Sequence, residues 1–149
     1  MTVIATQSRE AIMDFLRNNG VGVLATASKD GKAHAATIYV TYDDLANLYF
    51  ITKQDTQKNR NLRENPYAAI ALYDAKTQTT LQASGQVTQV TDMNKIDSIF
   101  HEVSHIALKT SQSGIPPTTQ LMAGGYLVYE LMPLECRLLG FSRRETSTL

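Results

Sequence analysis

The sequence contains a single cysteine, Cys136, so an internal disulfide bond and a cluster of thiolate metal ligands are both excluded. It also lacks an excess of charge of either sign, because fourteen basic residues balance fourteen acidic ones. Broad electrostatic attraction to nucleic acid or to an anionic membrane is therefore not expected, and neither is predicted as a partner. Any site for an anionic ligand must be built locally.

Long apolar runs are missing as well. No stretch approaches the roughly 20 apolar residues that span a membrane. The segment from Met1 to Thr6 lacks the basic start and apolar run of a signal peptide, so a cytoplasmic location is expected. Without internal repeats, linkers or low-complexity segments, residues 1–149 are expected to form one domain. Cys136, in a late apolar strand, is expected to be packed rather than reactive.

Two segments have the periodicity of amphipathic helices. The first is expected from Ser8 to Asn19, with Ser8 as its N-cap. The second is expected to start at Thr91 or Asp92 and to end near Leu108. A third, short helix is considered below because it belongs to the candidate site.

Several segments have the alternation or apolar composition of β-strands, separated by turn residues. Asp30-Gly31 tolerates the positive φ angles of a tight hairpin, and Gly85 inside a long strand predicts a bulge or bend. Many strands with few helices favour an antiparallel barrel with helices beside it. The strands are expected over 21–28, 33–42, 47–52, 67–73, 79–90, 125–131 and 135–141, with a functional loop over 109–122.

The stretch from Leu48 to Ala71 combines the features of an anion-binding site. An alternating strand ends near Thr52, and Thr56 then follows as the N-cap of a short basic helix that contains Lys58. Asn65-Pro66 ends this helix, because the residue before a proline is pushed out of the helical region. Free amides and the helix dipole attract anions at a helix N-terminus, and Thr56 and Lys58 add a hydroxyl and a cation.

This stretch also resembles a known family. The order YFIT…T-x-K…NL…NP, followed by an apolar strand, is similar to that of the flavin-binding split barrels related to pyridoxamine 5′-phosphate oxidase. The similarity extends upstream through Val23-Leu-Ala-Thr and Asp30-Gly31, and more weakly downstream to about Gly85. The resemblance implies a mainly β fold, a six-stranded antiparallel split β-barrel with flanking helices. It also implies a homodimer with FMN at the subunit interface.

The resemblance further implies which residues hold the cofactor. Thr52 and Lys58 match positions around the FMN phosphate, and residues 36–38 match the strand beneath the flavin ring. Small side chains and backbone amides on that strand would let a flat ring approach closely. The implied cofactor-binding residues are Ala36, Thr37, Ile38, Ile51, Thr52, Thr56, Gln57, Lys58, Thr80 and Leu81.

Two departures separate this sequence from the true vitamin B6 oxidases. Those enzymes carry arginines at the positions of Ala36 and Gln57, so two cationic contacts to the phosphate are missing here. They also carry an Arg-x-His pair near the C-terminus that holds the vitamer, and Arg137-Leu-Leu and Arg143-Arg144 supply no such pair. The resemblance is therefore to the general, short type of the family, whose members bind FMN, a deazaflavin or haem.

Two classes of function remain open on the sequence alone. The first is an FMN-dependent oxidoreductase that acts on an unidentified small molecule, with the flavin supplying the redox chemistry. No side chain can be assigned as a catalytic acid or base. The second is a non-catalytic binding or sensor protein that holds a flavin, a deazaflavin or haem without turnover.

A rival motif reads H-E-x-x-H over His101, Glu102 and His105 on a predicted helix. Residues four apart share a helix face, so the two imidazoles could bind zinc while the glutamate activates water, as in a zinc hydrolase. No histidine occurs after His105 to act as a third ligand. Solvent-facing or dimer-facing histidines are the preferred interpretation, and no metal is expected. His34, beside the proposed flavin positions, is interpreted as a surface histidine.

Overall fold

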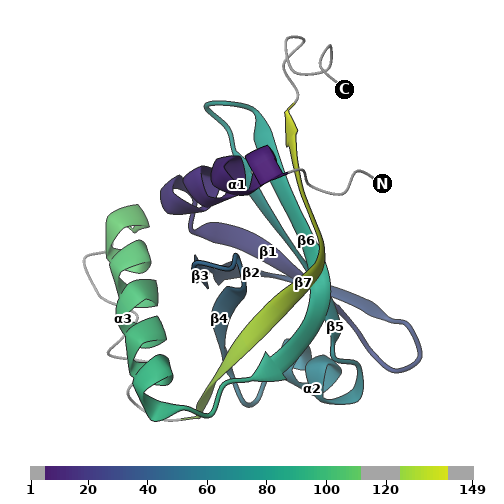
Figure 1. The fold of residues 1–149 in the computed structure, drawn as a ribbon. Helices are drawn as coiled ribbons and strands as arrows, with labels where there is room; N and C mark the ends of the chain where they lie inside the picture. Colours follow the sequence, from purple (N-terminus) through teal and green to yellow (C-terminus); the bar gives the residue numbers. More distant parts are fainter. Residues whose placement is uncertain (1–5, 112–124, 141–149) are drawn as a thin grey trace.

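The structure is a computed structural model that describes residues 6–111 and 125–140 (Figure 1). Within these ranges, every helix is too short or too polar to cross a membrane. In chain order the elements are α1 (Thr6–Asn18), β1 (Val21–Ala27), β2 (Ala33–Tyr39), β3 (Thr41–Tyr42), β4 (Leu48–Lys53), α2 (Gln57–Glu64), β5 (Tyr67–Asp74), β6 (Thr79–Gln89), α3 (Met93–Thr110) and β7 (Tyr126–Gly140).

The strands form one curled antiparallel sheet in the order β2-β1-β5-β6-β7-β4-β3. β2 and β3 lie at opposite edges of this sheet although only Val40 separates them in the chain. The chain therefore joins the two edges and holds the sheet in its curled form (Figure 1). The predicted mainly β, antiparallel split-barrel fold with flanking helices is confirmed.

The division into strands differs from the prediction at two places. The expected strand 33–42 is divided at Val40, which belongs to neither β2 nor β3; its amide donates to the carbonyl of Gly20 at 2.8 Å, at the end of the β1–β2 pairing. The expected strands 125–131 and 135–141 form one strand through 140, because Pro133 lies opposite Gly85 at an irregularity of the ladder. This register shift between Ser84 and Gly85 is the predicted bulge, and it tolerates a residue without an amide proton. Dividing one expected strand and joining two others leaves seven strands in the sheet, the number of strand segments expected from the pattern, whereas the resemblance implied six.

The helix boundaries also shift. α1 begins at Thr6, so Ser8 lies inside the helix and the prediction of Ser8 as its N-cap is wrong. Asp92 caps α3 as predicted, with its carboxylate accepting from the Asn94 amide at 3.0 Å. α3 continues to Thr110, beyond the predicted end, because the sequence there contains neither glycine nor proline. The rest of the predicted loop, from 112 to 122, and residue 141 lie outside the described residues.

Two apolar clusters hold these elements together. The larger cluster fills the interior of the curled sheet, where Leu24, Phe50 and Leu131 are fully buried, and α1 packs on it through Ile12 and Leu16. The smaller cluster joins α3 to the sheet and consists of Tyr49, Val90, Ile99, Val103 and Val128. Figure 1 shows the result: α1 and α2 lie at opposite ends of the sheet, and α3 stands at its side.

Cys136 is half-buried and packs against the larger cluster from β7. Burial raises the pKa of its thiol to about 11. At pH 8 only about one thiol in a thousand is then ionised, against about one in four for a free cysteine with a pKa near 8.5. We expect alkylation by iodoacetamide to be about a hundredfold slower in the folded protein than in urea. Equal rates in the two conditions would contradict this account.

Candidate functional site

The predicted anion cradle lies at the N-terminus of α2. Thr56 is the N-cap of this helix, as predicted, with an extended backbone and a side chain that accepts from the Asn59 amide at 3.4 Å. The helix ends before Asn65, whose amide donates to the Asn61 carbonyl at 2.7 Å, and Pro66 follows. The local sequence signals therefore predicted both ends of the helix correctly.

Two buried asparagines fix α2 against the barrel. Asn59 is completely buried: its amide nitrogen donates to the Gln54 carbonyl at 2.7 Å, and its oxygen accepts from the Tyr129 hydroxyl. Asn61 is 2% exposed and donates to the Thr26 hydroxyl at 3.0 Å. One asparagine thus ties α2 to β7 and the other ties it to β1. Sequence reasoning missed both residues, because nothing in the pattern distinguishes them from solvent-facing asparagines.

Replacing Asn59 should destabilise the protein. In Asn59→Leu, the buried Tyr129 hydroxyl and the Gln54 carbonyl both lose their partner, and each unsatisfied group costs about 1–3 kcal/mol. We expect urea unfolding to show a loss of about 2–4 kcal/mol. Asn94→Leu is the control, since the exposed Asn94 side chain should change stability by less than about 0.5 kcal/mol. Equal stability of the two variants would show that Asn59 does not anchor the helix.

The side-chain donors predicted for the phosphate are partly engaged within the turn. The Thr56 hydroxyl donates to the Lys53 carbonyl at 2.9 Å and lies 3.1 Å from the hydroxyl of Thr52, which is itself buried. The Gln57 amide donates to Asn61 at 2.9 Å and accepts from Arg60 at 3.2 Å. What remains for an anion is the pair of first-turn amides of Gln57 and Lys58, which have no intrahelical acceptor, and the Lys58 ammonium.

Lys58 has the properties expected of a cation that serves a ligand. Its side chain is half-buried, and burial lowers the pKa of its ammonium. Within residues 6–111 and 125–140, it forms no ion pair or hydrogen bond. Arg60, two positions further along α2, is by contrast exposed and paired with Asp55 at 3.3 Å. A half-buried charge without a partner favours the approach of an anion.

The residues predicted to lie around the flavin ring are divided between two faces of the sheet. Ile38 and Leu81 are buried in the core, 6% and 0% exposed, so only their backbone groups could meet a ligand. Thr37 and Thr80 lie on the outer face, while Ala36, on the inner face, and Ile51 are half-buried. The structure therefore places the phosphate positions together at α2, and it distributes the ring positions over β2, β4 and β6.

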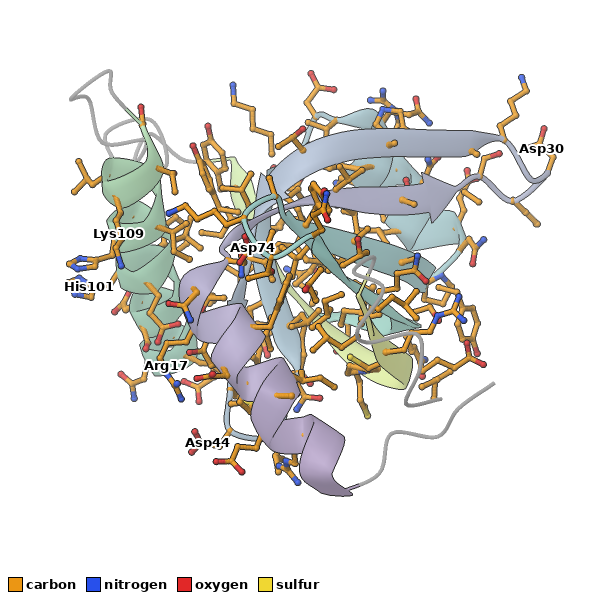
Figure 2. All side chains as sticks on the ribbon, turned by 90° about the horizontal axis from the view of Figure 1, so that it is seen from above. Arg17, Asp30, Asp44, Asp74, His101 and Lys109 are labelled. Carbon is orange, nitrogen blue, oxygen red and sulfur yellow. The ribbon has the colours of Figure 1, made fainter. Side chains whose placement is uncertain are left out.

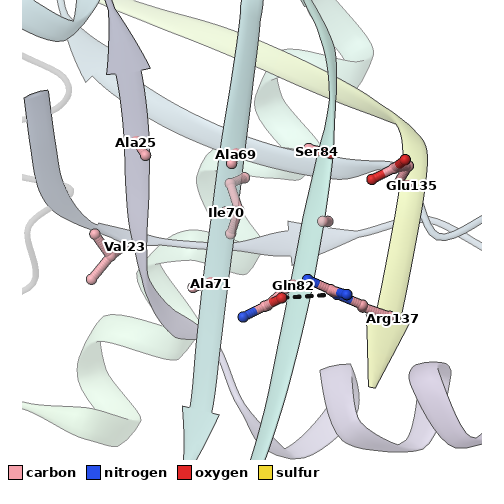
Figure 3. A pocket seen from close by; sticks show the side chains of 10 residues that line it. Val23, Ala25, Ala69, Ile70, Ala71, Gln82, Ser84, Glu135 and Arg137 are labelled. Carbon is pink, nitrogen blue, oxygen red and sulfur yellow. Dashed lines mark hydrogen bonds between the residues drawn. The ribbon is translucent and has the colours of Figure 1, made fainter. Parts of the chain in front are cut away.

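A shallow groove of about 280 Å³ crosses the outer face of β1, β5, β6 and β7 (Figure 3). Its floor is flat because Ala25, Ala69 and Ala71 carry only methyl groups. Its polar rim includes Arg137, whose Nε atom donates to the Gln82 side chain at 2.9 Å. Sequence reasoning missed this groove, although the small residues Ala69 and Ala71 on one face of β5 were a signal for it.

A larger groove of about 650 Å³ lies between the C-terminal end of α1, α3 and the segment from Val40 to Tyr42. Figure 2 shows Arg17, His101 and Lys109 on this side of the molecule. The groove begins directly after the β2 residues proposed for the flavin, and it contains several basic side chains. Its charged or imidazole-bearing lining residues are Arg17, His101, Glu102, His105 and Lys109.

The H-E-x-x-H residues lie on a helix, as predicted. His101 and His105 are exposed, and their ring centroids lie 6.2 Å apart. The Glu102 carboxylate accepts a hydrogen bond from the Thr41 hydroxyl. Among the described residues, no group of three or more histidine, cysteine, aspartate or glutamate side chains is arranged to hold a metal ion. The zinc-hydrolase hypothesis therefore gains no third ligand from this part of the chain.

Comparison with known proteins agrees with this fold. The family model described as pyridoxamine 5′-phosphate oxidase matches residues 8–138. The pyridoxine/pyridoxamine 5′-phosphate oxidase of Acinetobacter baumannii is 32% identical over 104 residues, which cover 66% of this chain and 47% of that enzyme. The chain thus spans about half the length of the curated relatives that it matches.

Solved structures with low sequence identity share the fold. A pyridoxamine 5′-phosphate oxidase-related, FMN binding protein from Nostoc punctiforme has a TM-score of 0.64 at 18% identity, over 93% of this chain and 87% of that one. A heme binding protein from Mycobacterium smegmatis has a TM-score of 0.70 at 16% identity, over 95% of this chain and 57% of that one. Since the family model covers most of the sequence, the chain belongs to the pyridoxamine 5′-phosphate oxidase family.

Proposed function

We propose that this protein binds FMN and uses it in the oxidation or reduction of a small molecule. The observation that carries the proposal is the N-terminus of α2, where Lys58 is half-buried without a partner in the described residues, beside two amides that lack an intrahelical acceptor. A terminal phosphate matches these donors in charge and in hydrogen-bonding capacity. The buried asparagines 59 and 61 hold the helix in place for this contact.

The remaining residues would position the ring and the substrate. Bound FMN would supply hydride or single-electron chemistry, while the protein supplies binding, orientation and electrostatics. Small Ala36 on β2 and the backbone of residues 36–38 would leave room for a flat ring. The groove between α1 and α3 lies next to this strand and would hold the substrate. Its lining carries both signs of charge, since Glu102 and Lys109 both face it and Arg17 is paired with Asp14.

We further propose a homodimer that uses the outer face of β1, β5, β6 and β7. This face carries a flat alanine floor and the partly exposed Val21 and Val23, at 38% and 42% exposure. Ligand sites favour interfaces between folded units, so a second copy would complete the cofactor site. Light scattering should give a dimer mass, and Ala71→Arg should shift it toward the monomer and weaken FMN binding. A stable monomer that binds FMN as tightly as the parent would contradict this proposal.

A second candidate is a non-catalytic binding or sensor protein for a flavin, a deazaflavin or haem. The structural likeness to a protein described as heme binding favours keeping this candidate. Steady consumption of NADH or NADPH by the FMN-loaded protein, with an electron acceptor present, distinguishes the two. Turnover that depends on added FMN supports the oxidoreductase. Tight FMN binding with no reduction by either nucleotide would favour the binding protein.

A further inference from the structure

The two histidines of the H-E-x-x-H motif have no part in the proposed function. His101 and His105 both line the groove between α1 and α3, and both side chains are exposed. Figure 2 shows His101 projecting outward from α3. Within residues 6–111 and 125–140, neither imidazole forms a hydrogen bond or an ion pair. Their ring nitrogens are therefore available to an external ligand.

The two rings are close enough to share one ion. Their centroids lie 6.2 Å apart, and their planes differ by 30°. A transition-metal ion lies about 2.0–2.1 Å from each ligating nitrogen, and therefore roughly 3 Å from each ring centroid. Tetrahedral coordination then requires a centroid separation of about 5 Å. Exposed side chains change rotamer within nanoseconds, so the rings can close the remaining distance of about 1 Å without a movement of the helix.

The backbone of α3 holds the two histidines at a fixed spacing. They are one helical turn apart and so lie on the same face of the helix. The opposite face is packed, since Ile99, Val103 and Ala107 are buried. Because this part of the backbone is already ordered, it loses little further conformational entropy when an ion binds. The pair is therefore a preorganised ligand with two nitrogen donors.

The groove determines the charges around such an ion. The Thr41 hydroxyl holds the Glu102 carboxylate by a hydrogen bond, so Glu102 is assigned as a nearby negative charge and not as a ligand. Lys109 is exposed and can keep its ammonium in the solvent, and Arg17 is paired with Asp14. Water from the groove would fill the other coordination positions of the ion. This arrangement differs from a structural zinc site, in which the protein supplies four ligands.

From these observations we propose that His101 and His105 chelate one divalent transition-metal ion at this groove. Imidazole is a good ligand for zinc, copper and nickel, whereas magnesium and calcium prefer oxygen ligands. With two protein ligands, the ion keeps positions for exchangeable ligands, such as water or a small anion. The proposal is independent of FMN binding, and it replaces the expectation from the sequence that no metal binds.

Isothermal titration of the protein, prepared without a histidine tag, tests the proposal. Zinc and copper(II) should each bind at one ion per chain, copper more tightly, and magnesium should not bind. His101→Gln and His105→Gln should each weaken zinc binding by at least about tenfold, because loss of a group that merely orients a ligand already costs about 10–100-fold. Absence of zinc and copper binding in the parent protein, or parental affinity in both variants, would overturn the proposal.

His34→Gln is the matched control, because it removes the remaining histidine of the sequence. His34 is half-buried on β2 and its Nδ1 atom has almost no accessible surface, so its interpretation as a surface histidine is wrong. The folded variant should bind zinc like the parent. Zinc binding that persists in the double variant His101→Gln/His105→Gln, or that disappears in folded His34→Gln, would place the ion elsewhere and overturn the assignment.

Thermal unfolding gives a second readout. An ion that binds only the folded protein stabilises it, so zinc should raise the Tm of the parent protein. The double variant should have nearly the parental Tm without metal, since both side chains are exposed, and zinc should not raise it. An equal rise of Tm in both proteins would contradict chelation by His101 and His105. These measurements do not involve flavin, so their outcome is separate from that of the proposed function.

Discussion

Lys58→Ala should weaken FMN binding by roughly 10- to 150-fold and leave riboflavin binding almost unchanged. A hydrogen bond to a charged group is worth about 1.5–3 kcal/mol, and each 1.4 kcal/mol is a factor of ten in affinity. The effect should fall at the high end of this range, because Ala36 and Gln57 contribute no charge and Lys58 has no competing partner in the described residues. Fluorescence titration of both ligands measures it.

Arg60→Ala is the matched control for this experiment. Arg60 lies on the same helix and carries the same charge, but it is exposed and paired with Asp55. Its removal should change FMN affinity by less than about twofold, since exposed ion pairs contribute little. If Lys58→Ala binds FMN like the parent protein, or loses riboflavin equally, the phosphate site is not at α2.

The second large effect is expected at the bulge. A Cβ atom added at Gly85 would lie 2.0 Å from the backbone oxygen of Met132 and 2.9 Å from its carbonyl carbon. Backbone atoms cannot move aside without breaking the β6–β7 ladder. Gly85→Ala should therefore reduce the free energy of unfolding by about 3 kcal/mol or more, as measured in urea.

Gly31→Ala provides the comparison for Gly85→Ala. Gly31 has a φ angle of +87° in the β1–β2 hairpin, but no atom lies within 4 Å of an added Cβ. Only the cost of a left-handed backbone applies there, about 1 kcal/mol. If the two variants are equally stable, the close approach at Gly85 does not control the fold.

The sequence predicted the helix α2 well because its signals are local. A capping threonine, a basic turn and an Asn-Pro stop determine α2 from a few neighbouring residues, and both ends of the helix are confirmed. These local signals did not predict that the side chains of Asn59 and Asn61 would be buried. Their burial depends on Tyr129 and Thr26, which come from distant strands, so it is a property of the tertiary structure.

The strand boundaries show the same limit. Residues 33–42 read as one strand because their composition is continuous, yet at Val40 the chain passes from one edge of the sheet to the other. The fused strand β7 was divided in the prediction because Pro133 normally interrupts pairing. The strand tolerates Pro133 because of the bulge at Gly85. Only the register of β6 and β7 shows that Pro133 and Gly85 lie opposite each other.

Side-chain environment was harder still to predict. His34 and the pair His101 and His105 all read as solvent-facing histidines, and only the pair on α3 is exposed. The groove on the outer face was not predicted because the set of residues that line it depends on the registers of four strands, β1, β5, β6 and β7. Resemblance to the family supplied candidate residues on β2 and β6, but it did not say which side chains face the core.

FMN is proposed to bind this protein through its phosphate. Isothermal titration of the purified protein with FMN and with riboflavin, together with its absorption spectrum after reconstitution, distinguishes this from every alternative considered above. We expect stoichiometric FMN with flavin bands and markedly weaker binding of riboflavin. A protein that binds neither flavin, or that excludes FMN and instead gives a Soret band with haem, would contradict it.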